Sequence, residues 1–336
     1  MRQMIADGYS GKVQCIVTSP PYWGLRDYGV AGQLGQEPTL CEFIANLVEV
    51  FALARDLLAD DGTLWMNIGD SYASRGGPTG PQTGAQFINR ARGKAAICLA
   101  NRNAGRDEGL KPKDLVGQPW RLAFALQDAG WYLRQDIVWH KPNPMPESVR
   151  DRCTKAHEYL FLLTKNERYY FDQNAIKVPS KNPEDDIRRI SQQKSGNKSV
   201  PTDTVNGLRP KKVRSPAGWK TGSGSHGSIH EAGREQEIKY AEIDGAMSNR
   251  RSVWTIPTES YSEAHFATFP QALVEPCILA GSRPGDIVFD PFLGSGTVAQ
   301  VAQRLGRHWL GCELNPAYLD LQRDRTRQLG LVLEAA

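Results

Sequence analysis

The C-terminal part of the sequence alternates strand-like and helix-like patterns, and this alternation limits the fold more than any other feature. Residues 286–290 (DIVFD) form a short apolar run typical of a buried strand, and the Gly-rich turn PFLGSGT follows at 291–297. A helical pattern at 298–305, a strand-like run at 309–313 and another helical pattern at 316–328 come next. Strands that alternate with helices predict an α/β fold with a mostly parallel sheet and helices on both faces.

The sequence ahead of residue 286 shows the same alternation. Strands are predicted at 13–17, 63–68, 137–140 and 159–164, and helices at 39–59, 120–127 and 269–280. At 336 residues, the chain is long enough for one large domain with a sizeable insertion. No apolar signal core opens the sequence, and the six cysteines form neither a CxxC pair nor a cluster with histidine. We therefore expect a cytoplasmic protein with no membrane segment, disulfide framework or metal site.

Two polar segments interrupt the alternation, and both are basic. Residues 75–113 carry eight Lys or Arg against two Asp or Glu, and residues 177–251 carry fifteen against nine. We expect 75–113 to be a long functional loop and 177–252 to be an insertion with its own task, because neither can bury much apolar surface. The predicted organisation is a catalytic half at 1–176, the insertion at 177–252 and a ligand-binding half at 253–336.

The turn FDPFLGSGT, residues 289–297, has features of a nucleoside-binding loop. Gly294 and Gly296 allow close approach of the backbone to a ligand, and the helix that follows offers free N–H groups. Glu313 comes at the end of the next predicted strand, where an acidic side chain can accept hydrogen bonds from a ribose. The turn is neither a Walker A loop, which needs a lysine after the last glycine, nor a GxGxxG loop.

The stretch TSPPY, residues 18–22, ends the first predicted strand. Pro20 and Pro21 fix the backbone and remove two donors, so the local carbonyls are rigid and free to accept, and Ser19 adds a side-chain oxygen. Such a row of acceptors suits the exocyclic amino group of a nucleobase, and Tyr22 offers a stacking face to a base flipped out of the duplex. Taken alone, the stretch fits a rigid structural turn equally well; together with the Gly-rich turn it favours the functional reading.

These motifs together resemble those of the S-adenosylmethionine-dependent DNA amino-methyltransferases with the motif order of the β group. FDPFLGSGT resembles the cofactor motif, and TSPPY resembles the catalytic motif, which precedes it in the chain. HFATFPQALVEPCI (265–278) and GWYLRQDIVWHKPNPMPESVRDRCTKAHEYLFLLTK (130–165) resemble the segments that flank the cofactor motif and the recognition region. The resemblance implies a Rossmann-like methyltransferase fold with permuted motif order. Family chains usually carry a strand ending in Gly-Asp ahead of the catalytic strand; none precedes it here, so the sheet is expected to lack or borrow one.

The resemblance also implies the site residues. The base would be held by Ser19, Pro20, Pro21 and Tyr22. S-adenosylmethionine would be held by Phe266, Thr268, Phe269, Pro270, Asp290, Pro291, Phe292, Gly294, Ser295, Gly296, Thr297 and Glu313. The resemblance also implies that the insertion at 177–252 is the target-recognition region. The basic segments are expected to contact DNA through Arg90, Arg92, Lys94, Arg209, Lys211, Lys212 and Arg214.

The expected activity is methyl transfer to the amino group of a base in double-stranded DNA. TSPPY resembles the cytosine-N4 pattern, whereas Asp-Pro-Pro-Tyr dominates among adenine-N6 enzymes, so cytosine N4 is preferred and adenine N6 is the alternative. Alternatives of other classes are a non-catalytic nucleic-acid-binding protein and a methyltransferase acting on RNA or on a protein amide. A homodimer and a cognate restriction nuclease are left open as further partners.

Overall fold

The computed structural model of the chain describes residues 1–25, 27, 29–73, 109–180, 247–259 and 270–327. The chain divides into two compact units, one formed by Met1–Ala175 with Arg251–Ala336 and the other by Ile176–Arg250. The first unit holds both of the motifs singled out above.

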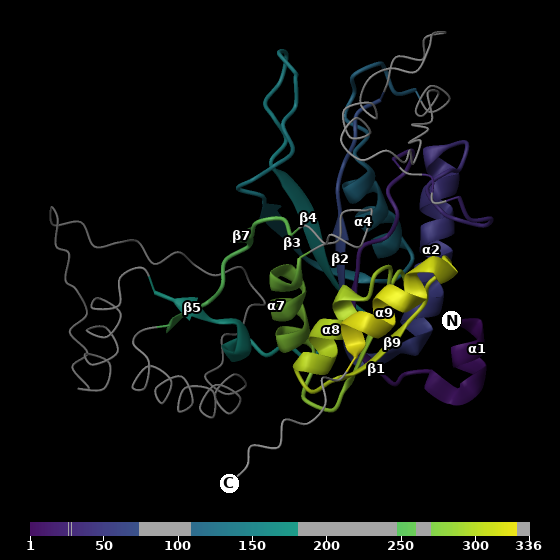
Figure 1. Cartoon of the computed structure of the whole chain (residues 1–336), viewed down its shortest axis with the longest axis vertical. Helices are drawn as coiled ribbons and strands as arrows, with labels where there is room; N and C mark the ends of the chain where they lie inside the picture. The colour runs from purple at the N-terminus through teal and green to yellow at the C-terminus, as the bar shows by residue number, and fades with distance from the viewer. Residues whose placement is uncertain (26, 28, 74–108, 181–246, 260–269, 328–336) are drawn as a thin grey trace, which may run out of the picture. The chain divides into compact units, whose positions relative to one another are not determined.

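A seven-stranded sheet in the order β7-β3-β4-β2-β1-β8-β9 is the framework of the first unit (Figure 1). Its strands are β1 (Val13–Thr18), β2 (Leu58–Ile68), β3 (Tyr132–His140), β4 (His157–Thr164), β7 (Val253–Thr255), β8 (Ile287–Asp290) and β9 (His308–Gly311). β4 runs antiparallel to its neighbours β2 and β3, and the other four neighbouring pairs are parallel. The predicted mostly parallel α/β fold with permuted motif order is confirmed.

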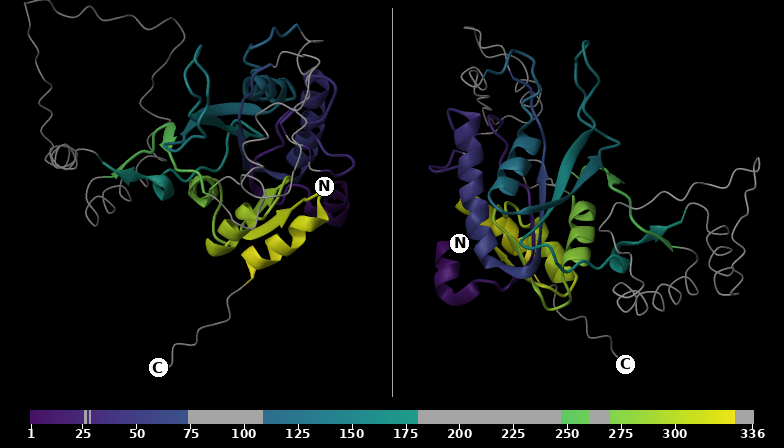
Figure 2. Two further views of the ribbon diagram at one scale, coloured as in Figure 1. Left: turned by 45° about the horizontal axis from the view of Figure 1, so that its top comes forward. Right: turned by 180° about the vertical axis from the view of Figure 1, so that it is seen from behind.

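Helices cover both faces of this sheet (Figures 1 and 2). On one face, α2 (Leu40–Leu57) and α4 (Gln118–Asp128) pack into a core that includes Ile16 and Leu64. On the other face, α7 (Gln271–Gly281) approaches so closely that a Cβ on Gly281 would lie 2.8 Å from Cys15 Sγ. Neighbouring residues of a strand point to opposite faces of the sheet, and helices cover both faces. All residues of β1 are therefore buried, as expected of a central parallel strand.

The helix α2 follows from its sequence pattern. Its buried side chains recur every three or four residues and form one apolar stripe; they are Leu40, Phe43, Leu47, Phe51, Ala54 and Leu57. Thr39 caps its first turn by accepting a hydrogen bond from the Glu42 N–H at 3.1 Å. The predicted helix at 39–59 is therefore confirmed to within two residues at each end.

The remaining elements are short. They are α1 (Arg2–Met4), η1 (Ile5–Tyr9), η2 (Asn174–Ile176), α8 (Thr297–Arg304), η3 (Pro316–Tyr318) and α9 (Leu319–Thr326). In the second unit, β5 (Val178–Pro179) pairs with β6 (Met247–Ser248). Its assignment as a target-recognition insertion stays a prediction. Within the described residues, none of the helices is long and apolar enough to span a bilayer.

The sheet ends at β9, and no strand ending in Gly-Asp precedes β1 among the described residues. Within the described part of the chain, β9 pairs with β8 alone and forms the edge of the sheet. The residues ahead of β1 are helical, and the Met1 amino group lies 3.8 Å from Cys312 Sγ, just beyond β9. That the sheet lacks or borrows this strand stays a prediction.

Candidate active site

The two motifs meet where β1 and β8 end. The strands are parallel neighbours, with Ile16 opposite Phe289, so both carboxyl ends lie at the same edge of the sheet. There the Thr18 hydroxyl donates a 2.6 Å hydrogen bond to Asp290 Oδ1, between two buried side chains 272 positions apart in sequence. Ligands in open α/β sheets bind at this edge, which makes the junction of β1 and β8 the candidate site.

The loop after β1 is held by Trp23, which directly follows Tyr22. Trp23 is 2% exposed and packs in the core, and its indole N–H donates to the Glu37 carbonyl at 3.0 Å. Its backbone N–H donates to Gln118 Oε1 at 3.1 Å, at the start of α4. With Trp23 fixed in the core and Pro20 and Pro21 rigid, the half-buried Tyr22 is placed beside the strand ends.

Ser19 and Tyr22 face polar groups from two other strands. The Ser19 hydroxyl lies 3.5 Å from Asn67 Oδ1 near the end of β2, at the outer limit of a hydrogen bond. The Tyr22 hydroxyl donates to Glu158 Oε2 at 2.9 Å, at the start of β4. Burial and the neighbouring Glu158 carboxylate raise the pKa of Tyr22 well above its usual range, so the phenol stays protonated.

The Gly-rich turn is closed by its own backbone and by Glu313. The Gly294 N–H donates to Glu313 Oε2 at 2.7 Å, and the Gly294 carbonyl accepts from Gln322 Nε2 at 2.7 Å. Gly294 and Gly296 have φ values of 52° and 88°, in the left-handed region that favours glycine. Glu313 lies two residues beyond the end of β9 rather than at the strand end itself, and its Oε1 accepts from the Asn315 N–H at 2.7 Å.

Two buried polar atoms beside this turn have no hydrogen-bond partner among the described residues, Asp290 Oδ2 and Ser295 Oγ. A buried polar atom without a partner is costly unless a ligand or water satisfies it. The Asp290 carboxyl is buried, which raises its pKa to about 7, although hydrogen bonds from Thr18 and from the Phe292 N–H oppose this rise. These free acceptors and donors indicate a ligand site at the turn.

The raised pKa of Asp290 predicts a pH-dependent stability. The pKa of Asp290 is about 7 in the folded protein and lies above its ordinary value of 3.8. The contribution of Asp290 to stability is therefore fully present below about pH 4 and is lost as the pH rises through 7. The loss is about 4 kcal/mol at most in the unfolding free energy. We expect thermal unfolding without ligand to show a smaller decline between pH 5 and 8 in Asp290→Asn than in the wild type. The exposed Asp320→Asn is the control; equal declines in wild type and Asp290→Asn would contradict the assignment.

The other predicted residues divide into two groups. Pro291 and Thr297 are buried at the two ends of the turn, and Phe292 packs edge-on against Phe51 of α2 with ring centroids 6.5 Å apart. The Pro270 carbonyl accepts hydrogen bonds from the Leu273 and Val274 N–H groups in the first turn of α7. Outside the described residues lie Phe266, Thr268, Phe269, Arg90, Arg92, Lys94, Arg209, Lys211, Lys212 and Arg214. The ends of the predicted loop at 75–113 do meet, because the Ala73 N–H donates to the Asp114 carbonyl at 2.8 Å.

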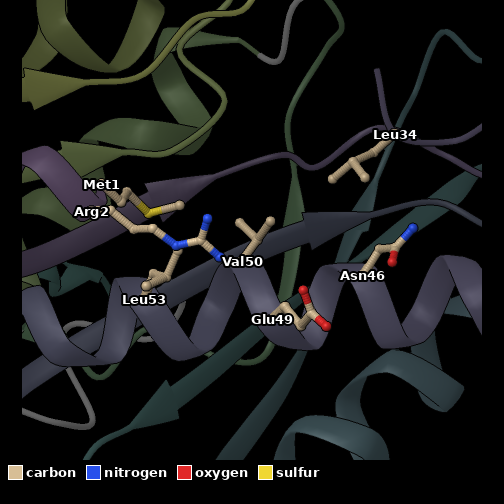
Figure 3. A pocket seen from close by; sticks show the side chains of 7 residues that line it. All are labelled: Met1, Arg2, Leu34, Asn46, Glu49, Val50 and Leu53. Atoms are coloured by element: carbon tan, nitrogen blue, oxygen red, sulfur yellow. The ribbon is translucent and has the colours of Figure 1, made fainter. Parts of the chain in front are cut away.

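A pocket lies between the N-terminal segment and one face of α2 (Figure 3). Its volume is about 370 Å³, and its lining residues are Met1, Arg2, Leu34, Asn46, Glu49, Val50 and Leu53. None of these residues belongs to either motif. The candidate site therefore rests on the strand ends and their hydrogen bonds rather than on this pocket.

Sequence reasoning missed several polar residues at the site. Asn67 and Asp70 lie at and just beyond the end of β2, and Asp70 Oδ1 accepts from the Gly117 N–H at 2.9 Å and so caps α4. The strand-end signal used for Ser19 could have found both. Glu158 could not be found in that way, because it reaches the site from the amino end of β4, the strand that runs antiparallel to its neighbours.

Comparisons with known proteins identify the family of the chain. A family model described as DNA methylase matches residues 13–324. The chain is 45% identical to the type II methyltransferase M.Cfr9I of Citrobacter freundii, over 94% of this chain and 82% of that protein. It is 44% identical to the type II methyltransferase M.SmaI of Serratia marcescens, over 93% of this chain and 83% of that protein.

Solved structures share the fold at low sequence identity. The PvuII DNA methyltransferase, described as cytosine-N4-specific, superposes with a TM-score of 0.55 at 16% identity. The match covers 96% of this chain and 82% of that protein. A protein of Thermus thermophilus, described as a DNA modification methylase complexed with S-adenosyl-L-methionine, superposes with a TM-score of 0.51 at 21% identity. The match covers 97% of this chain and 89% of that protein.

Proposed function

Because the chain belongs to the DNA methylase family, we propose that it transfers a methyl group from S-adenosylmethionine to the exocyclic amino group of a flipped DNA base. The preferred target in this proposal is cytosine N4. The observation that carries the proposal is the buried hydrogen bond from Thr18 to Asp290, which joins the ends of β1 and β8. A methyl donor at one strand end and a base at the other would thus be neighbours.

The residues of the Gly-rich turn fit the cofactor. S-adenosylmethionine carries an ammonium, a carboxylate and a ribose diol, and it supplies a methyl group activated by a sulfonium. Ser295 Oγ and Asp290 Oδ2 are buried polar atoms without partners among the described residues, and Glu313 has carboxylate lone pairs in excess of its two backbone bonds. Gly294, Ser295 and Gly296 would hold the methionine part and Glu313 the ribose. Phe266, Thr268, Phe269 and Pro270 are assigned to the methionine end from the family motif.

The catalytic loop would hold the base by its amino hydrogens. The Ser19 hydroxyl and the carbonyls of the Pro20–Pro21 turn are the acceptors, and the half-buried Tyr22 ring is the stacking surface. Two accepted hydrogens draw the amino nitrogen toward tetrahedral geometry and direct its lone pair away from Ser19. Catalysis then consists mainly of orienting this lone pair, and the proton released after transfer passes to water, directly or relayed by the Ser19 hydroxyl.

Cytosine N4 is preferred over adenine N6 because the catalytic motif begins with Thr18-Ser19 rather than with aspartate. A neutral hydroxyl at Ser19 accepts one amino hydrogen as an aspartate would, and it adds no charge to the base site. Adenine N6 is the alternative target within the same family. The paired motifs argue against a non-catalytic binding protein.

The double-stranded DNA would be contacted by the two basic segments, 75–113 and 177–251. Their excess of Lys and Arg over Asp and Glu suits phosphate contacts whose affinity falls with salt. Because the relatives named above are type II methyltransferases, we extend the proposal to a cognate restriction nuclease that acts at the same DNA sequence.

The modified nucleoside tests this proposal directly. Unmethylated genomic DNA incubated with the purified protein and S-adenosylmethionine, then digested to nucleosides, is expected to contain N4-methylcytosine by mass spectrometry. Omission of S-adenosylmethionine is the control. N6-methyladenine instead would reassign the target base, and the absence of any methylated nucleoside would refute the proposed activity.

A further inference from the structure

A partly buried ion pair lies directly behind Tyr22. The Tyr22 hydroxyl donates to Glu158 Oε2 at 2.9 Å, while Glu158 Oε1 accepts a hydrogen bond from Lys141 Nζ. The Glu158 and Lys141 side chains are only 18% and 19% exposed. The three side chains come from the loop after β1, from β4 and from the residue after β3, so the fold gathers them from distant parts of the chain.

We propose that Glu158 is a positioning residue for methyl transfer, which fixes the ring of Tyr22 against the target base through the phenol hydroxyl. This inference rests on the proposed role of Tyr22 as the stacking surface. A tyrosine ring on a loop is free to swing about two side-chain bonds, and every orientation but one would misplace a stacked base. One hydrogen bond at the far end of the ring removes this freedom before the base arrives.

Packing around the pair supports a fixed ring. Gly69 lies against both partners: a Cβ at this position would lie 2.9 Å from Tyr22 Cε2 and 3.2 Å from Glu158 Cδ. A side chain at Gly69 would therefore push the ring and the carboxylate out of place. Glycine at this point lets the end of β2 pack directly against the Tyr22–Glu158 contact.

Charge keeps the contact in one hydrogen-bonded form. Glu158 accepts from Lys141 Nζ through one oxygen and from the Tyr22 hydroxyl through the other, and the phenol of Tyr22, whose pKa is raised, stays protonated and can donate. Lys141 Nζ also lies 4.3 Å from the ring centroid of Trp139, a favourable cation–π distance. The Trp139 indole N–H donates to the Ile256 carbonyl at 2.9 Å, so the network is anchored in the sheet.

A purely structural ion pair would predict different kinetics. If Glu158 acts through the phenol hydroxyl, then removing either partner of that hydrogen bond should cause the same defect, and removing both should cause no more. If Glu158 only stabilises the sheet, its loss should lower thermal stability and leave the rate per folded molecule unchanged.

A double-mutant cycle on the full chain separates these cases. Single-turnover methylation of DNA with radiolabelled S-adenosylmethionine is measured for the wild type, Tyr22→Phe, Glu158→Ala and the double variant. We expect each single variant to be slower by about tenfold, because a charge-assisted hydrogen bond is lost, and the double variant to be no slower than either. Cofactor dissociation constants should be unchanged, and Glu158→Gln, which keeps an acceptor, should recover most of the rate.

Two further variants keep the result interpretable. Glu275→Ala breaks the Arg304–Glu275 ion pair, 3.2 Å apart and distant in sequence from Tyr22, and should match the wild type. If Glu158→Ala does not fold, Glu158→Leu combined with Lys141→Met replaces it, because this pair of changes leaves no unpaired buried charge.

Multiplicative defects in the double variant, or a normal rate for folded Glu158→Ala, would overturn the inference while leaving the proposed function intact. Absence of methylation by the wild type and Glu275→Ala would instead defeat the proposed function, and the role of Glu158 with it.

Discussion

Replacing Tyr22 or Ser19 with alanine is expected to lower the rate of methyl transfer by about 100-fold or more, while affinity for S-adenosylmethionine changes less than about threefold. Ser19→Ala removes an acceptor for the amino hydrogens. A loss of rate of about 100-fold is typical when one oriented group is removed from a reacting centre. Tyr22→Ala removes the stacking face, worth about 1–3 kcal/mol per base, together with the orientation it imposes. Neither side chain belongs to the Gly-rich turn, so cofactor binding should persist.

Single-turnover methylation beside cofactor titration by calorimetry measures both quantities for each variant. Tyr132→Ala is the matched control, because Tyr132 is 45% exposed at the start of β3, the end of that strand away from its carboxyl edge. Its rate and cofactor affinity should equal those of the wild type. Unchanged transfer rates in both Ser19→Ala and Tyr22→Ala would contradict the assignment of the catalytic loop.

The opposite pattern is expected for Gly296→Val, which should weaken cofactor binding by about 100-fold or more. Gly296 has a φ of 88°, which a β-branched residue tolerates poorly. An added Cβ would also lie 3.3 Å from Gln322 Cα and Cγ, and Gln322 holds the Gly294 carbonyl at 2.7 Å. The turn must therefore change shape, and the backbone that would contact the methionine part is displaced.

Gly306→Val provides a control for strain alone. Gly306 also has a positive φ, 73°, but an added Cβ there would meet no atom within 4 Å. Both variants should unfold at lower temperature than the wild type, but only Gly296→Val should lose cofactor affinity. A folded Gly296→Val protein that binds S-adenosylmethionine like the wild type would show that the turn is not the cofactor site.

The strands and helices near the two motifs were predictable because their signals are local. The all-buried run of β1 and the apolar stripe of α2 are readable from consecutive residues, and the structure places both elements within two residues of the prediction. β7 (Val253–Thr255) was missed, since three residues carry no readable period. The strand predicted at 137–140 begins five residues earlier, at Tyr132, where the polar side chains of an exposed strand end mask the pattern.

The sequence by itself determined the fold class, the family and the two motifs, because strand periodicity, glycine and proline chemistry and motif order are all written in short stretches. Only the tertiary structure decided which distant polar groups meet: Thr18 with Asp290, and Tyr22 with Glu158 and Lys141. These contacts depend on the order and direction of strands in the sheet, above all on β4 running against its neighbours. Strand direction is fixed by the packing of the whole domain, and no local run of residues encodes it.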